Sequence, residues 1–344
     1  MKYEVTIGVP VYNVEKNIHL MLDSVLSQTF ESIELLILDD CGTDRSIDIV
    51  HQYQQTHPRG KHIRIVQQPR NMGIGNGRNR ILSETHTPYV YFMDADDAIA
   101  PRTIELLYQQ AQRYQADIVY GSYERIEEFN GDTKKSLFQY PAMQFLNDNE
   151  FADFVYNDYG FLQATTWNFL IRTEIFTKNH IKYKPVNYWE DFTTTIDLPC
   201  YIHRAVLMPD VTYSYYCRYG SASGYEEHQF LSKETVQQTI DAMALVKANS
   251  RNLKSRPYFH KRMHKVMATH FYMACTIIKY EKITEPPFTM REIRDVMTSP
   301  LTLTETLRLK GWRLKNLALC LFGVLPPWLS VFAIRWVGKC KGLV

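Results

Sequence analysis

The stretch Tyr89-Val90-Tyr91-Phe92-Met93-Asp94-Ala95-Asp96 decides the fold of this 344-residue chain. Its apolar part follows Pro88 and is rich in aromatic and β-branched residues, which predicts a short buried strand. Helical patterns flank it on both sides, so we expect the strand to belong to an α/β sheet, where ligands bind beyond the carboxyl ends of the strands. Two carboxylates at such an end, Asp94 and Asp96, suit Mg²⁺ or Mn²⁺ carrying a phosphorylated ligand.

A second predicted strand, over residues 34–38, also ends in carboxylates, Asp39 and Asp40. Two carboxylates at a buried strand end repel each other and need a cation or a hydrogen-bond donor. A carboxylate in this position can accept the imide N–H of uracil. The two acidic strand ends together predict a metal–nucleotide crevice at one edge of the sheet.

The first third of the chain alternates strand patterns with helix patterns. We expect strands over residues 5–11, 35–38, 63–66, 89–93 and 118–123, and helices over residues 15–28, 44–55, 75–82 and 101–114. This order predicts an α/β fold with a mostly parallel sheet and helices on both faces. We expect this domain to cover residues 1–225, followed by a helical region over 226–300 and a distinct segment over 301–344.

The pattern is looser beyond residue 130. Residues 131–139 are polar and predict a surface excursion. The remaining expectations are short helices over 149–157 and 166–176, strands over 205–208 and 211–216 around a turn at Pro209-Asp210, and helices over 231–248, 258–280 and 290–297.

Composition excludes several classes of protein. A net charge of +2 gives no case for a nucleic-acid-binding protein. The six cysteines are scattered without Cys-x-x-Cys or Cys/His ligand spacing, which argues against structural zinc and indicates a reducing compartment. The chain runs from Met1 straight into a predicted strand without a signal peptide, so we expect a cytoplasmic location.

The segment 317–334 carries no charge and has basic residues on both sides. It is barely long enough to span a bilayer, and Pro326-Pro327 interrupts it, which would leave backbone groups unsatisfied in lipid. The favoured interpretation is a segment that lies in the membrane interface, so that the protein is peripheral on the inner face of the cell membrane. The alternative is a helical hairpin packed on the domain.

The glycine-rich segment 71–79 opens a predicted helix. It superficially matches a dinucleotide-binding fingerprint, but it follows the third predicted strand instead of the first, and its spacing is Gly-x-Gly-x-Gly, so we discount that interpretation. Arg78 within it could still reach a nucleotide.

In combination these segments resemble glycosyltransferase family 2. The matching stretches are Val9-Pro10-Val11-Tyr12-Asn13, Ser27-Gln28-Thr29-Phe30, residues 39–46, residues 71–79 and Asp94-Ala95-Asp96-Asp97. The resemblance covers about the first 220 residues and implies a Rossmann-like nucleotide-sugar transferase domain of GT-A type. It implies that the donor is bound by Pro10, Val11, Tyr12, Asn13, Glu15, Asp40, Arg78, Asp94 and Ala95.

Within that donor site, the resemblance implies that Asp40 meets the uracil, Asp94 the ribose, and Asp96 the metal, Mn²⁺ or Mg²⁺, that bridges the diphosphate. The chain departs from the family pattern at Cys41-Gly42, where Gly-Ser is usual. This exchange alters the loop but removes no carboxylate.

The resemblance extends to Trp189-Glu190-Asp191, where similar enzymes begin a helix and use the aspartate as the base. Transfer to a hydroxyl requires removal of its proton, which a positioned carboxylate achieves, and a helix N-terminus keeps that carboxylate ionised. We therefore expect Asp191, in preference to Glu190, to be the catalytic base. The alternative is ordinary charge complementarity at a helix N-terminus.

Three aromatic side chains are candidates for stacking on the acceptor sugar, namely Trp167, Tyr188 and Trp189, although core packing is the default for any single Trp. Arg218 with Ser221 matches a family segment that approaches the diphosphate; a loop salt bridge is the equal alternative.

These features predict a metal-dependent, inverting glycosyltransferase of hexosyltransferase type. It would use a nucleoside-diphosphate sugar, UDP-based, and an acceptor that is a saccharide or lipid-linked, as in cell-surface polysaccharide synthesis. Two alternatives stay open: a nucleotidyltransferase that makes an activated sugar, and a non-catalytic relative that binds nucleotide sugars.

Overall fold

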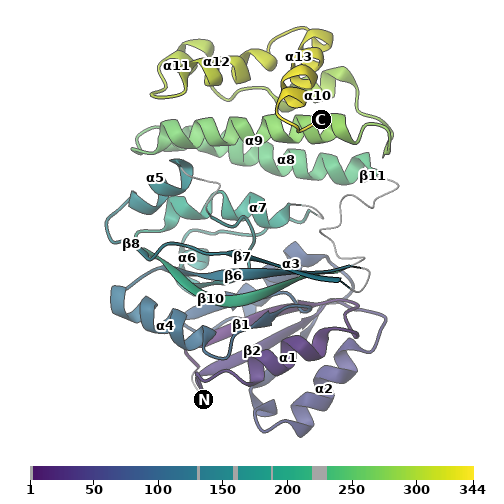
Figure 1. The fold of residues 1–344 in the computed structure, drawn as a ribbon, viewed down its shortest axis with the longest axis vertical. Helices are drawn as coiled ribbons and strands as arrows, with labels where there is room; N and C mark the ends of the chain where they lie inside the picture. Colours follow the sequence, from purple (N-terminus) through teal and green to yellow (C-terminus); the bar gives the residue numbers. More distant parts are fainter. Residues whose placement is uncertain (1–2, 130–131, 158–161, 187–188, 219–230) are drawn as a thin grey trace. The chain divides into compact units, whose positions relative to one another are not determined.

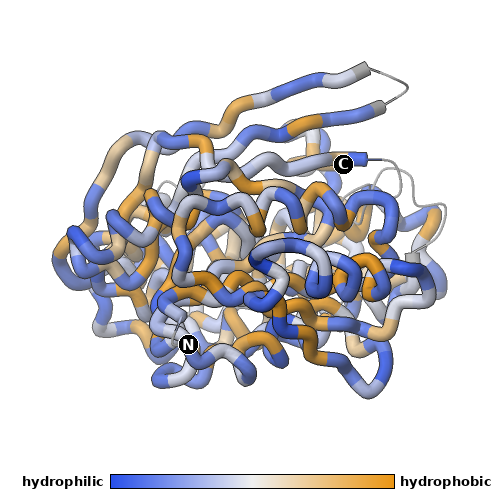
Figure 2. The backbone as a smooth tube through the Cα atoms, turned by 90° about the horizontal axis from the view of Figure 1, so that it is seen from below, coloured by the Kyte–Doolittle hydropathy of each residue, from blue (hydrophilic) through white to orange (hydrophobic). Residues whose placement is uncertain are grey.

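A computed structural model describes residues 3–129, 132–157, 162–186, 189–218 and 231–344. The chain divides into two compact units. The first comprises Met1–Phe151, Gln163–Pro185 and Glu190–Tyr225, and the second comprises Ala152–Leu162, Val186–Trp189 and Glu226–Val344. Each unit is described below by itself. Figure 2 shows that hydrophobic and hydrophilic stretches alternate along the backbone.

The first unit is built on a ten-stranded sheet in which β1 lies between β2 and β4. Figure 1 labels β1, β2, β6 and β10 of this sheet. The strand order is β3-β2-β1-β4-β9-β6-β10-β5, with β7 paired to β6 and β8 to β10. Four neighbouring strands pair parallel with one another, namely β1 (Val5–Val11), β2 (Ile33–Asp39), β3 (Ile63–Gln67) and β4 (Tyr89–Phe92), and β10 also pairs parallel with β6. The predicted parallel α/β sheet is therefore confirmed, and the carboxyl ends of β2, β1 and β4 are neighbours.

Helices cover both faces of this parallel part. The α-helices are α1 (Ile18–Leu26), α2 (Ser46–Thr56), α3 (Ile74–Glu84) and α4 (Thr103–Tyr114). Successive side chains of a strand point to opposite faces, and Ile7 and Val9 belong to one buried cluster with Leu22 of α1 and Leu107 of α4. The face between them carries Gly8, where an added Cβ would lie 2.4 Å from Ile81 Cγ2 of α3. Glycine in β1 therefore permits the close approach of α3.

The second half of the sheet differs from the sequence-based expectation in three places. Residues 131–139 were expected as a surface excursion, but β7 (Asp132–Phe138) forms a hairpin with β6 (Ile118–Phe129). Its solvent-facing ion pairs, such as Lys135 with Glu124 at 3.5 Å, give the strand a polar sequence that hides its β periodicity.

The expected helix over residues 166–176 is also wrong. The segment contains β9 (Phe169–Arg172), which pairs antiparallel with both β4 and β6, followed by the short α6 (Thr173–Lys178). A short apolar run that is buried on both faces has no periodicity to distinguish strand from helix. In the same way, the two strands expected around Pro209-Asp210 form one strand, β10 (Ala205–Arg218), with register shifts beside that dipeptide.

The remaining elements are shorter or belong to the second unit. They are β5 (Ala98–Ile99), β8 (Met143–Phe145), α5 (Glu150–Asn157), α7 (Glu190–Thr195), α8 (Lys233–Asn249), α9 (Phe259–Lys279), α10 (Met290–Val296), α11 (Leu303–Leu307), α12 (Arg313–Phe322), α13 (Pro327–Cys340), the strand pair β11 (Leu231–Ser232) and β12 (Thr284–Glu285), and 3₁₀ turns at Gly60–His62, Leu198–Tyr201 and Ser250–Leu253.

The second unit is helical and centres on α9, which packs against α8, α10, α12 and α13. Its core contains a buried guanidinium, Arg262, which donates to Ser250 Oγ at 3.0 Å and to Tyr156 Oη at 2.5 Å. Pro326 and Pro327 separate α12 from α13, as expected, because Pro327 is the first residue of α13. Across the described residues, every helix is too short or too polar to cross a bilayer.

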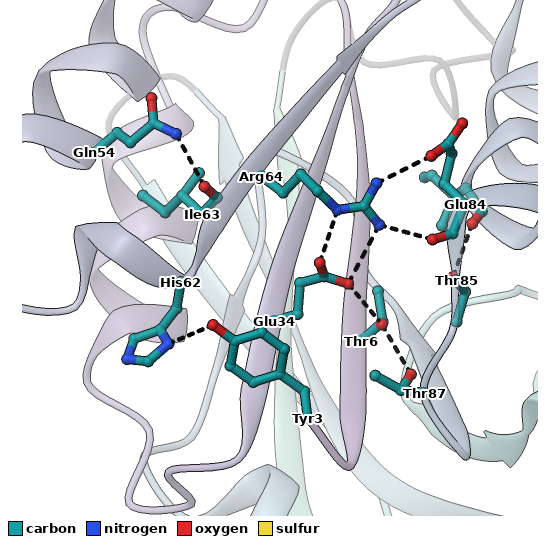
Figure 3. Close-up of polar contacts among 11 residues, drawn as sticks. Tyr3, Thr6, Glu34, Gln54, His62, Ile63, Arg64, Glu84, Thr85 and Thr87 are labelled. Atoms are coloured by element: carbon teal, nitrogen blue, oxygen red, sulfur yellow. Dashed lines mark hydrogen bonds and ion pairs between the residues drawn. The ribbon is translucent and has the colours of Figure 1, made fainter. Parts of the chain in front are cut away.

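A charged network ties three strands and one helix of the first unit together (Figure 3). Arg64 of β3 donates to Glu34 of β2 at 2.7 Å, to the Glu84 carboxylate at 3.0 Å and to the Glu84 carbonyl, at the end of α3, at 2.7 Å. Glu34 also accepts from Thr6 Oγ1 of β1 at 3.1 Å. The planar guanidinium satisfies a carboxylate and a helix-terminal carbonyl at the same time, which a lysine ammonium does less well.

We therefore expect Arg64→Met to lower the free energy of unfolding by about 1 to 2 kcal/mol, because it leaves Glu34 and the Glu84 carbonyl without their charged donor. Arg64→Lys should recover only part of this loss. Urea unfolding followed by the fluorescence of the first unit measures the change. Arg80→Met is the matched control, since it removes an exposed partner of Glu84 and should cost less than about 0.5 kcal/mol. Equal losses in Arg64→Met and Arg80→Met would contradict the prediction.

Candidate functional site

The predicted crevice side chains lie at one edge of the parallel sheet. Val11 is paired with Asp39 across β1 and β2, and the backbone N–H of Asp40 donates to the Val11 carbonyl at 3.0 Å. On the other side of β1, the N–H of Met93 donates to the Gly8 carbonyl at 3.3 Å, so β4 delivers Asp94 to the same edge. The central position of β1 thus brings together the two acidic strand ends that lie far apart in the sequence.

A cavity of about 180 Å³ opens between the ends of β1 and β2. Its lining includes Val11, Asn13, Asp39 and Cys41. The Asp39 carboxylate accepts from the Cys41 N–H and from Gln67 Nε2, both at 2.9 Å, and it lies on the cavity wall.

Asp40 faces a different element. Its carboxylate accepts the backbone N–H groups of Met72 at 2.8 Å and Gly73 at 3.0 Å, so it holds the glycine-rich loop that opens α3. Burial raises the pKa of Asp40, although the two backbone hydrogen bonds oppose this shift. Sequence reasoning assigned the base contact to Asp40, and it missed Asp39 as the carboxylate that lines the cavity. The two are adjacent in sequence, and only the direction of each side chain separates them.

The loop beyond β1 and the loop beyond β2 hold each other. Asn13 Oδ1 accepts the Thr43 N–H at 2.7 Å, and Glu15 Oε2 accepts the Arg45 N–H at 3.0 Å. Cys41 adopts a left-handed φ of 59°, a conformation that favours glycine. Glycine, which the family pattern has at this position, would adopt this φ without strain, whereas Cys41 adopts it at a cost in backbone strain.

The other predicted residues of this loop differ in exposure. Val11 and Ala95 are buried, so their side chains are almost inaccessible to a donor. Tyr12 is 46% exposed and presents its ring to solvent at the end of β1. Pro10 lies in β1 beside Gly77 of α3, where an added Cβ would be 3.6 Å from Pro10 Cβ and only 2.9 Å from Leu38 Cδ2.

The centre of the site is the guanidinium of Arg78, which is 1% exposed. It donates to Glu190 Oε1 at 2.9 Å, to Asp191 Oδ1, and to Asp94 Oδ1 at 3.3 Å. One buried cation from α3 thus binds carboxylates from β4 and α7. The structure thus brings Arg78 and Asp94, which were predicted for the donor, together with Glu190 and Asp191, which were predicted for catalysis; their common contact with one guanidinium was not predicted.

Glycines allow Arg78 to reach this position. Helix α3 begins after Gly73, which has a φ of 81°. An added Cβ on Gly75 would lie 2.3 Å from the Lys184 carbonyl oxygen, so the first turn of α3 packs directly against the backbone of the segment before α7. The Gly-x-Gly-x-Gly spacing therefore serves close packing of α3.

Three carboxylates around one guanidinium leave an excess of negative charge. Burial raises the pKa of Asp94 to about 7, with Arg78 opposing the shift and Asp191 and Asp96 adding to it. Burial, together with the charge of Asp191, likewise raises the pKa of Glu190 to about 7. Burial disfavours the charge of Arg78, but the surrounding carboxylates outweigh it and raise its pKa. The site is therefore suited to a proton or to an added cation.

Asp96 is the candidate metal ligand. Burial raises its pKa as well, and its side chain is not committed to another protein group in the way that Asp97 is. Asp97 is fully buried and accepts from Tyr213 Oη at 2.6 Å and from the Tyr216 N–H at 2.8 Å, which makes it a structural residue. Arg218 donates to the Asp96 carbonyl at 2.8 Å and to Glu128 at 3.1 Å. The salt bridge that was the alternative to a diphosphate contact is therefore present, and the same guanidinium lies beside Asp96.

These residues fit a hard divalent cation. Within the described ranges, no group of three or more His, Cys, Asp or Glu side chains is arranged to enclose a metal. A Mg²⁺ or Mn²⁺ ion that carries a diphosphate needs only one or two carboxylates, because phosphate and water oxygens complete its coordination. The buried excess of carboxylate at Asp94 and Asp96 supplies the charge for such an ion.

Asp191 lies at the start of α7, which begins at Glu190 as predicted. Its carboxylate accepts from Thr166 Oγ1 at 2.5 Å in addition to Arg78, so two donors fix its orientation. Thr166 is a fully buried residue that sequence reasoning missed, and no sequence pattern marks it. The Asp191 side chain is 20% exposed against 11% for Glu190, so Asp191 is the more accessible of the two.

The three aromatic candidates for the acceptor site lie in different environments. Trp167 is 3% exposed and stacks on Tyr213 at 4.5 Å and on Tyr215 at 5.2 Å, inside the core of the first unit. Its ring is held in this core, which agrees with the default expectation for a single Trp and leaves almost none of it exposed to a sugar. Trp189 belongs to the second unit, where it stacks on Tyr272 at 6.0 Å. Tyr188 and Ser221 lie outside the described residues.

The raised pKa of Asp94 predicts how stability depends on pH. The unfolded state releases this proton near pH 4, whereas the folded state retains it up to about pH 7, so the free energy of unfolding falls between these values. Asp94→Asn should therefore stabilise the ligand-free protein relative to wild type, and more at pH 8 than at pH 5, by on the order of 1 to 3 kcal/mol.

Urea unfolding at pH 5, 6.5 and 8 measures this difference. Asp23→Asn is the control, since Asp23 lies at the surface and pairs with Tyr53. A stability difference between Asp94→Asn and wild type that is the same at all three pH values would contradict the raised pKa.

The chain resembles known proteins over most of its length. The sequence model described as glycosyl transferase family 2 matches residues 6–179. A cholesterol galactosyltransferase of Borreliella burgdorferi is 26% identical over 64% of this chain and 62% of its own length, so the chain spans less than two thirds of that relative. The glycosyltransferase GlyG of Streptococcus pneumoniae is 27% identical over 63% of this chain and 72% of GlyG.

Solved structures show the same fold. S. aureus TarS 1–349 in complex with UDP-GlcNAc is 18% identical, with a TM-score of 0.69 over 99% of this chain and 92% of that one. The mannosyltransferase PcManGT of Pyrobaculum calidifontis, in complex with GDP-Man and Mn²⁺, is 14% identical, with a TM-score of 0.53 over 98% of this chain and 88% of PcManGT. The predicted GT-A type of fold is confirmed. The family match over half of the chain, on a sheet with this arrangement of acidic strand ends, shows that the protein belongs to glycosyl transferase family 2.

Proposed function

We propose that this glycosyltransferase moves a sugar from a uridine-diphosphate donor to a hydroxyl of a saccharide or lipid-linked acceptor, with inversion at the anomeric carbon. The observation that carries the proposal is the convergence of Asp94, Glu190 and Asp191 on the buried Arg78. Asp94 follows β4, and the cavity lined by Asp39 lies at the ends of β1 and β2, which are the next strands of the sheet.

The cavity between β1 and β2 is the proposed site of the base. Asp39 can accept the imide N–H of uracil there, and the exposed ring of Tyr12 can cover the base from the other side. Asp40 supports this site indirectly, because it holds the loop that positions α3 and Arg78. A UDP-GlcNAc complex of TarS, which has the same fold, supports a uridine donor.

Asp96, with Asp94 beside it, is the proposed holder of Mn²⁺ or Mg²⁺ at the donor diphosphate. When bound, the divalent cation supplies Lewis-acid stabilisation of the departing diphosphate. Arg218, which donates to the Asp96 carbonyl, lies where its charge can assist the same phosphates. The complex of PcManGT with GDP-Man and Mn²⁺ is a precedent on this fold.

Asp191 is the proposed general base. Inversion needs one direct displacement, and the attacking hydroxyl must lose its proton as the bond forms. Thr166 and Arg78 orient the Asp191 carboxylate, and its greater exposure makes it the more accessible of the pair to an acceptor. Glu190 is more deeply buried, with its pKa raised to about 7, and is proposed to balance the charge of Arg78.

The acceptor is proposed to be a growing saccharide or lipid-linked glycan at the cytoplasmic face of the cell membrane. The relatives include a cholesterol galactosyltransferase and a poly(ribitol-phosphate) beta-glucosyltransferase, whose names give a lipid and a polymer as acceptors. Screening the hydrolysis of a panel of nucleotide sugars with and without Mn²⁺ tests donor and metal together. Turnover of none of them would favour a non-catalytic relative, and release of pyrophosphate from a nucleoside triphosphate and a sugar phosphate would favour a nucleotidyltransferase.

We expect Asp96→Ala to abolish the metal dependence of donor binding, because it removes the proposed ligand while leaving the base cavity intact. Calorimetric titration of UDP with and without Mn²⁺ measures this. Glu128→Gln is the matched control, since it removes the partner of Arg218 beside Asp96 without touching a crevice carboxylate. Metal dependence that survives in Asp96→Ala would overturn the assignment.

We expect Asp191→Asn to leave UDP affinity unchanged and to slow sugar transfer by about 10²- to 10⁴-fold, which is the usual contribution of a general base. Single-turnover transfer, measured beside donor affinity, separates the two effects. Glu190→Gln is the isosteric comparison. If Glu190→Gln is the inactive variant and Asp191→Asn remains active, the two residues have the opposite roles.

A further inference from the structure

Helix α13 carries an aromatic stripe, formed by Trp328, Phe332 and Trp336, on its solvent face. These side chains are 64%, 65% and 64% exposed. Spacings of four residues place all three on one side of the helix. With roughly 150–250 Å² per aromatic side chain, the stripe leaves on the order of 300–500 Å² of apolar surface in water.

The stripe is held on a packed helix. The opposite side of α13 is buried through Ser330, Val331, Ile334 and Gly338, and it packs against α9 and α10. An added Cβ on Gly338 would lie 3.0 Å from the Cys275 sulfur of α9, which shows how closely the two helices approach. The inner face of α13 is packed, as the helical-hairpin alternative expects. Its outer face is apolar and exposed, which is the feature that an interfacial segment needs.

Two further apolar side chains near α13 in the sequence are exposed. Leu314 of α12 is 84% exposed, and Val324 of the turn before α13 is 61% exposed. The stripe alone is as large as the largest apolar patch of a typical monomeric protein, and such patches are often functional.

The chain segment that carries this surface has charge of one sign. Residues 306–344 contain no Asp or Glu, and they contain seven basic residues, Arg308, Lys310, Arg313, Lys315, Arg335, Lys339 and Lys341. Arg335 pairs with Glu281, at 2.8 Å. Lys339 follows the stripe on the same side of α13, so a cation lies directly beside the aromatic rings.

We propose that the aromatic stripe docks the protein on the surface of an anionic lipid bilayer. Tryptophan rings prefer the headgroup level of a membrane, and a helix with an apolar face and basic surroundings lies in the interface plane. Basic side chains near the surface are attracted to anionic lipids by about 1 kcal/mol each.

A second copy of the chain is a less suitable occupant of the same surface. A specific interface buries about 800 Å² on each partner, which exceeds the stripe. Pairing of two copies would also bring two sets of unbalanced positive charge together. The inference goes beyond the proposed sugar transfer, because it depends neither on the donor nor on the acceptor.

Flotation of the full-length protein with vesicles tests the proposal. One set of vesicles is phosphatidylcholine alone, and the other contains about one third phosphatidylglycerol; both are tested at low and high salt. We expect the protein to float with anionic vesicles at low salt and to partition less with neutral vesicles or at high salt. The emission of the exposed Trp328 and Trp336 should shift to shorter wavelength on binding.

The decisive variant is Trp328→Gln/Phe332→Gln/Trp336→Gln, which should partition at least about tenfold less while unfolding at the same temperature, because all three residues are exposed. Leu245→Gln, another exposed apolar residue of the second unit, is the control and should float like wild type. The proposal fails if wild type stays in solution with both vesicles, or if the triple variant floats as well as wild type. A dimer that the triple variant abolishes, without vesicle binding by wild type, would also overturn it and assign the stripe to self-association.

Discussion

The buried guanidinium of Arg78 is the interaction on which the candidate site depends. It compensates carboxylates from two elements, β4 and α7, that would otherwise repel one another. A cation in this position needs a helix that approaches both elements closely, and the glycines of α3 make this approach possible. The glycine-rich segment, which superficially matches a nucleotide-binding fingerprint, serves here to place a side chain.

The charge excess left by this cluster connects the fold to the proposed chemistry. One guanidinium does not neutralise Asp94, Glu190 and Asp191, and burial raises the pKa of Asp94 and Glu190 to about 7. Such a site binds a proton or a further cation readily. A donor diphosphate that arrived with a divalent metal would bring both the cation and its counter-charge, so the charge of this site suits the proposed metal–donor pair. Thr166 is neutral, so its hydrogen bond orients the Asp191 carboxylate without changing the net charge of this cluster.

The helical second unit carries an exposed apolar surface on α13. Its helices bury one side of α13 and leave an apolar side with aromatic rings in water, next to a segment of purely basic charge. A protein whose proposed acceptor is lipid-linked has a use for such a surface, since attachment to the bilayer raises the effective concentration of acceptor.

The sequence by itself determined the order of strands and helices in the first third of the chain, because hydrophobic periodicity and strand-end polarity are local signals. It also determined which carboxylates end the strands and where Pro326-Pro327 interrupts the terminal helices. It did not determine β9 or β7, since an apolar run buried on both faces and a polar exposed hairpin both lack a distinguishing period. Only the tertiary structure decided that Asp39, and not Asp40, lines the cavity, that Trp167 is core, that Thr166 binds Asp191, and which side of α13 is exposed. Each of these depends on the direction of a side chain relative to an element distant in the sequence, and that direction is fixed by packing.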